Sequence, residues 1–87
     1  MKVVTIKDIV RKDLPIYYRL MYTGVAVIEL TKGETDYQID FSIEIKATGQ
    51  MLIVVTFKDE LDYPLFPVVQ EIKKIITAMH DDGTLPN

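Results

Sequence analysis

One segment in the middle of the chain alternates strictly between apolar and polar side chains. From Tyr37 to Ile45 every odd-numbered position is apolar, and from Asp36 to Lys46 every even-numbered position is polar. Side chains of a β-strand point alternately to the two faces of a sheet, so this pattern predicts a strand with one apolar and one polar face. It is the strongest structural signal in the sequence, and it constrains the fold rather than the chemistry.

The alternating strand is followed by a predicted hairpin. The residues from Lys46 to Gln50 include a glycine and suit a loop, and Met51 to Lys58 begins with aliphatic residues on both faces. Strands that are apolar on both faces generally lie in the interior of a sheet. We therefore expect Thr35–Lys58 to form the middle of the sheet.

Two further strands are predicted before this hairpin. Val25 to Thr31 is rich in β-branched residues. The aromatic segment from Ile16 to Tyr22 also favours a strand, although it could form a helical turn that ends at Gly24. In the strand interpretation, Gly24 marks a bulge or bend between the two segments.

The turn after Val25–Thr31 determines which residues face one another. A two-residue turn at Lys32–Gly33 sets Ile28 opposite Tyr37 and Ala26 opposite Ile39. Directly opposed residues share a face of the sheet, so this register gathers the apolar side chains of both strands on one side.

The C-terminal part of the sequence predicts an amphipathic helix. Apolar residues recur at spacings of three and four between Leu65 and Met79, with polar residues on the opposite side. Pro64 and Pro67 suit the first turn, where a missing N–H has no partner to lose. The helix is expected to end at Asp81-Asp82-Gly83, with the glycine in the left-handed conformation.

The N-terminal segment combines two patterns. Val3 to Thr5 suits a short edge strand, whereas Ile6, Ile9 and Val10 fall at helical spacing. We therefore predict a short helix over Ile6–Lys12, which ends before Pro15 because proline disfavours helical geometry in the residue before it.

These elements predict a single α+β domain over residues 1–87. It has two layers: an antiparallel meander of three to four strands, and the C-terminal helix packed on one face beside a short N-terminal helix. An alternative is the order α-β-β-β-α, which also occurs in domains that bind double-stranded RNA. That order is a topological analogy alone.

Composition excludes several classes of function. The chain has no cysteine, which rules out disulfides and thiol chemistry and favours a reducing compartment. Its net charge is −3 and its basic residues do not cluster, which argues against nucleic acid and anionic membranes. The longest uncharged run, Leu20 to Ile28, is far shorter than the roughly 20 residues of a membrane span. Because charges at Lys7 and Asp8 also interrupt any signal peptide, we expect a cytoplasmic protein.

No catalytic, cofactor-binding or metal-binding motif is present. Asp36, Asp40 and Glu44 share a strand face, but successive members are about 13 Å apart, too far for an acid/base pair. The acidic loop at residues 59–62 lacks the glycine and ligand spacing of a calcium loop. His80 lies beside two aspartates at a helix end, where the helix dipole explains it. We therefore predict no catalytic residue, metal or cofactor.

The residues most typical of a binding surface form two groups. Tyrosine and arginine are enriched in interface hot spots, and several occur together in the segment before Gly24. Apolar residues also interrupt the polar sheet face, and such patches often mark contact with a partner. The candidate contact residues are Tyr17, Tyr18, Arg19, Tyr22, Val25, Leu52 and Val54.

The hypothesis that follows is a non-catalytic domain that binds a protein partner or a second copy of itself. One alternative is a ligand-binding or enzymatic domain that uses the acidic sheet face and the tyrosines, which a second subunit could complete. Another is contact with nucleic acid through the RNA-binding-like topology, which the net charge of −3 disfavours.

Overall fold

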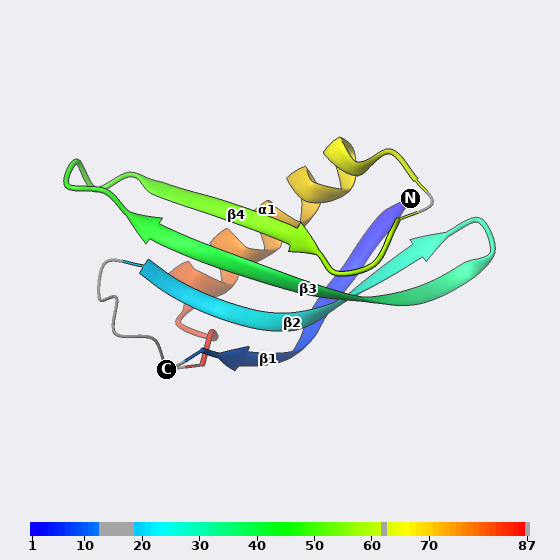
Figure 1. Ribbon diagram of the computed structural model, residues 1–87, viewed down its shortest axis with the longest axis horizontal. Coiled ribbons are helices and arrows are strands. Elements are labelled where there is room, and N and C mark those ends of the chain that lie inside the picture. The colour runs from blue at the N-terminus through cyan, green and yellow to red at the C-terminus, as the bar shows by residue number, and fades with distance from the viewer. Residues whose placement is uncertain (13–18, 62, 87) are drawn as a thin grey trace.

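The computed structural model describes residues 1–12, 19–61 and 63–86. Four strands are followed by one helix: β1 (Lys2–Arg11), β2 (Arg19–Leu30), β3 (Gly33–Ile45), β4 (Met51–Phe57) and α1 (Leu65–Asp82). The strands form one antiparallel sheet in the order β1-β2-β3-β4. The helix crosses one face of this sheet and contacts both β1 and β4 (Figure 1). The α+β class, the antiparallel meander and the C-terminal helix are thus confirmed.

The core lies between α1 and the sheet face that it covers, which we call the inner face. The β3 residues Ile39, Phe41 and Ile43 and the α1 residues Val68, Ile72 and Ile76 are at most 2% exposed. Each fully buried aliphatic side chain of this size contributes about 1.5–3 kcal/mol through removal of apolar surface from water. The alternating pattern of β3 and the periodicity of α1 therefore meet in one hydrophobic cluster, as predicted.

The helix ends as the sequence predicts. Gly83 adopts a left-handed conformation with φ 71°, and its N–H donates to the carbonyl of His80. The N–H of Thr84 donates to the carbonyl of Met79 at 2.9 Å, which satisfies a second carbonyl of the last turn. No helix in the described part of the chain is long and apolar enough to cross a membrane.

The N-terminal segment is a strand, so the predicted helix over Ile6–Lys12 is wrong. β1 pairs with β2, and its register shifts between Val3 and Thr5 and again between Lys7 and Val10. Each shift inserts one extra residue into β1, as in a β-bulge. Two bulges turn the usual spacing of two into a spacing of three.

This spacing explains why the sequence looks helical. Val3 and Ile6 are buried and Ile9 packs against the core, so inner-face residues recur at every third position of a strand. Asp8, within the second bulge, has a φ of 53°. Because the order of elements is β-β-β-β-α, the α-β-β-β-α alternative is also wrong.

The described part of the aromatic segment belongs to one long strand. β2 runs without interruption from Arg19 to Leu30, and its pairing with β3 continues through Gly24. The bend predicted at Gly24 is therefore absent from β2, and the irregularity lies in β1 beside it. A Cβ atom at Gly24 would lie only 3.2 Å from Ile6 Cγ2, so the glycine leaves room for the bulged strand.

The hairpin between β2 and β3 is shifted by two residues from the predicted register. Leu30 pairs with Gly33 and Ala26 with Tyr37, because the turn is formed by Thr31–Lys32. Gly33 follows the turn with a φ of 117°, which favours glycine there. A shift of two residues leaves every side chain on its predicted face, so the core is unaffected.

Candidate functional site

The two edges of the sheet are built very differently. β1 carries two bulges and charged residues along its length, including Lys7 and Arg11. β4 pairs with β3 in unbroken register and contains neither charge nor proline. Proteins commonly protect free edges with bulges, charges or proline, because unpaired N–H and C=O groups are templates for another strand. β1 has this protection and β4 does not.

The location of β4 corrects one expectation. The sequence predicts Thr35–Lys58 as the middle of the sheet, but only β3 of this pair is internal and β4 forms an edge (Figure 1). β4 is apolar on both faces, yet its outer face, opposite α1, is open: Leu52 is 41% exposed and Val54 48%. The apolar composition of β4 is therefore not explained by burial in this chain.

The direction of the free backbone groups follows from the pairing with β3. At one end of β4 the N–H of Lys58 donates to the carbonyl of Gln38, and at the other the N–H of Lys46 donates to the carbonyl of Gln50. Hydrogen-bonded pairs alternate along an antiparallel ladder. The even-numbered residues of β4 therefore direct their backbone groups toward β3. The N–H and C=O groups directed to the free edge belong to Met51, Ile53, Val55 and Phe57.

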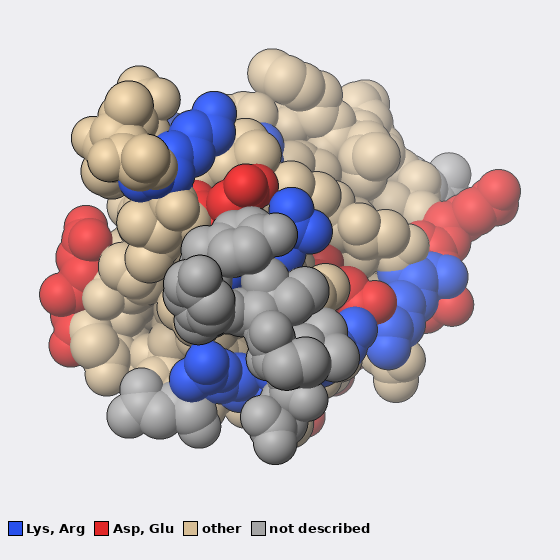
Figure 2. All heavy atoms as spheres, turned by 60° about the vertical axis from the view of Figure 1, so that its left-hand side comes forward, with Lys and Arg blue, Asp and Glu red and all other residues tan. Residues whose placement is uncertain are grey.

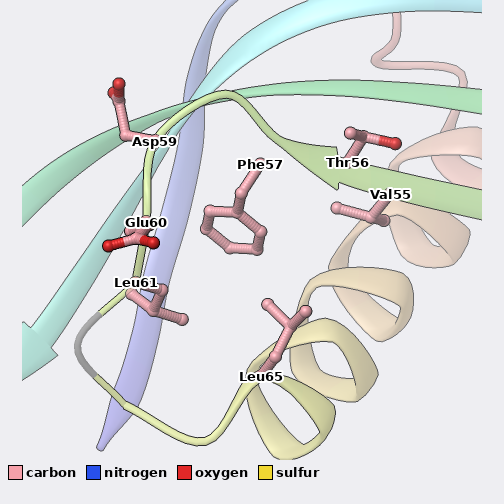
Figure 3. Close-up of a pocket in the computed structure, with 7 residues that line it drawn as sticks. All are labelled: Val55, Thr56, Phe57, Asp59, Glu60, Leu61 and Leu65. Carbon is pink, nitrogen blue, oxygen red and sulfur yellow. The ribbon is translucent and has the colours of Figure 1, made fainter.

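An apolar pocket lies at the C-terminal end of this edge. It has a volume of about 780 Å³ and is enclosed by the last residues of β4, the connection to α1 and the first turn of α1. Phe57, Leu61 and Leu65 point toward one another across it, whereas the Asp59 carboxylate points away (Figure 3). Leu65 is 52% exposed and its neighbour Phe66 75%.

We define the β4 edge as the outward backbone groups of β4 together with Leu52, Val54, Leu65 and Phe66. Sequence reasoning identifies Leu52 and Val54 but not Leu65 and Phe66. Leu65 fits the apolar periodicity of the helix, which predicts a covered side chain, but it lies in the first turn of α1. Fully buried residues of α1 begin at Val68.

The other predicted contact residues do not join this surface. Tyr22 is 3% exposed and stacks on Phe41, with ring centroids 5.0 Å apart, so it belongs to the core. Val25 is half-buried and lies opposite Gln38, four residues along the sheet from the row that holds Val54. Arg19 pairs with Glu44 on the outer face. Tyr17 and Tyr18 lie outside the described residues.

The acidic outer face of β3 is paired with basic side chains. Asp36 lies 3.0 Å from Lys7, and the hydrogen bond and charge of that carboxylate raise the pKa of Lys7 above its usual value. The other two carboxylates of the row are also paired: Asp40 with Lys12 and Lys58, each at 3.6 Å, and Glu44 with Arg19 at 3.4 Å. Acidic and basic atoms accordingly lie side by side in Figure 2.

These pairs leave little that resembles a reaction centre. Across residues 1–12, 19–61 and 63–86, no three His, Asp or Glu side chains gather where they could hold a metal ion. His80 Nδ1 lies 3.9 Å from Asp81 Oδ1, beyond hydrogen-bond distance, at the exposed end of α1. The geometry therefore favours the β4 edge as the candidate site.

Comparison of the chain with curated proteins and with solved structures finds no match. A protein-family model matches residues 1–81, a range that takes in all four strands and nearly all of α1. The chain therefore belongs to the BB_0187 family.

Proposed function

We propose that the chain is a non-catalytic protein-interaction domain whose contact surface is the β4 edge. The observation that carries the proposal is an unprotected, uncharged edge strand flanked by exposed apolar side chains. An added strand would pair with the outward N–H and C=O groups, which supplies affinity, while neighbouring pockets select its side chains. The pocket between Phe57 and Leu65 provides such a position.

The alternative of an enzyme or ligand-binding domain on the acidic face has less support. Each carboxylate of that face has a basic partner within 4 Å, so the face is close to neutral along β3. A general acid or base would require a carboxyl or imidazole group directed into a cleft. The pocket beside β4 has an apolar interior instead. The cytoplasmic location remains a prediction from the sequence.

Photo-crosslinking in the organism's own cells tests this proposal. Benzoylphenylalanine replaces Phe66, an exposed aromatic residue beside the β4 edge, and in a control it replaces Val10 at the opposite edge, where exposure is 60%. We expect irradiation to give discrete protein adducts at position 66 and none at position 10. Absence of adducts at position 66, or equal adducts at both positions, would contradict the proposal.

A further inference from the structure

We infer that the partner of the β4 edge is a second copy of this chain. The inference rests on the proposed function and specifies it. The β4 strands of two copies pair antiparallel about a two-fold axis beside Val54, which joins the two four-stranded sheets into one.

The register follows from the backbone groups that β4 directs outward. These belong to the odd-numbered residues, so any antiparallel partner must bond to odd-numbered residues. A two-fold axis at Val54 satisfies this condition for two identical strands. It sets Met51 opposite Phe57 and Ile53 opposite Val55, and it is the one two-fold register that pairs all seven residues of Met51–Phe57.

The side chains brought together are compatible. On the outer face Val54 meets Val54 of the second copy, and Leu52 meets Thr56. On the inner face Met51 approaches Phe57, close to the pocket that Leu65 lines. Both helices lie on the same side of the joined sheet, because the axis is perpendicular to it. No charge of β4 is opposed to another, since the strand has none.

The flanking charges also fit. The same rotation brings the hairpin loop that carries Lys46 toward the connection of the second copy, which carries Asp59 and Glu60. All three residues are exposed in the single chain. Repulsion between two chains of net charge −3 is weak beyond a Debye length of about 8 Å in physiological salt, so these local contacts dominate.

The arrangement closes at two copies. Pairing of the two β4 edges removes both unprotected edges at once, and the edges that remain are the bulged and charged β1 strands. A symmetric interface that uses the same patch on both copies forms a closed dimer rather than a filament. An unrelated strand would cover one β4 edge for each partner consumed, whereas a second copy covers two edges in one contact.

Single cysteines test the register, because the chain has no cysteine of its own. Opposed residues of a non-hydrogen-bonded antiparallel pair have Cα atoms about 4.5 Å apart, within the range of a disulfide. Val54→Cys should therefore give a covalent dimer on mild oxidation. Leu52→Cys is the matched control on the same strand, because its two copies would lie about 14 Å apart.

The expected result is that V54C forms the disulfide dimer at least about tenfold faster than L52C or V10C, while an equimolar mixture of L52C and T56C forms the mixed dimer. These variants alter half-exposed or exposed positions, and circular dichroism checks that each remains folded. Sedimentation of the wild type should show the average mass rise with concentration from 10.0 kDa toward twice that value. Val54→Asp should abolish the rise, since it opposes two like charges at the axis.

Each possible failure has a distinct meaning. A wild type that sediments as a monomer at millimolar concentration overturns the dimer, as does equal oxidation of V54C and V10C. A dimer in which L52C crosslinks to itself overturns the register. If the dimer is absent but position 66 gives adducts of another protein's mass in cells, this inference falls and the proposed function stands.

Discussion

The left-handed backbone at Asp8 allows a sharp test of the N-terminal strand. Its φ of 53° lies in a region that L side chains disfavour, by about 1–2 kcal/mol for most residues and less for Asp. Glycine occupies that region without this penalty, and β-branched residues are genuine outliers there. We expect Asp8→Gly to raise the free energy of unfolding by up to about 1 kcal/mol. Asp8→Val should lower it by about 1–2 kcal/mol.

The comparison of the two variants isolates backbone conformation, because both remove the same carboxylate. Thermal and urea unfolding, followed by circular dichroism, measures the difference. For a domain of this size 1 kcal/mol corresponds to about 4–8 °C in Tm, so D8G and D8V should differ by roughly 8 °C or more. Val10→Gly, in the same strand but without a positive φ, is the control and should be destabilising.

The opposite order would refute the bulged strand. In a helix interior glycine is less favourable than aspartate, whereas valine is comparable to it. A helix over Ile6–Lys12 therefore predicts that D8G is less stable than D8V. The two structures thus differ in the sign of the effect and not only in its size.

Three further outcomes test the core, the bulge and the outer face. Ile39→Ala, at a fully buried position, should lower the free energy of unfolding by about 2–5 kcal/mol in urea denaturation. Ile45→Ala in the same strand, where the side chain is 44% exposed, should lower it by less than half as much. Gly24→Val should cost about 1–3 kcal/mol in the same assay, because the side chain would overlap the bulged part of β1. The raised pKa of Lys7 means that its pairing stabilises the fold below about pH 10.5 and ceases to do so as the pH rises through the folded-state pKa. In an NMR titration Asp36→Asn should return this pKa toward its usual value, with little change in stability because the pair is exposed.

The parts of the fold that the sequence predicts correctly depend on local periodicity. β3 alternates without a bulge, and α1 keeps its spacing over five turns, so each pattern maps onto one face. The prediction fails at β1 because a bulge changes the period of a strand. With two bulges, Val3, Ile6 and Ile9 share a face at a spacing of three, which overlaps the spacing of a helix.

The composition of a strand does not determine its place in a sheet. The apolar faces of β4 predict an internal strand, and that rule assumes that every apolar face is covered within one chain. In the structure β4 is an edge with Leu52 and Val54 open to solvent. An uncharged edge strand is a liability to a monomer, because it can pair with any exposed strand. The contradiction between composition and position disappears if a second strand covers the edge, and that is the physical basis for assigning the interaction to β4. The same rule accounts for β1, whose bulges and charges are those of an edge that stays exposed.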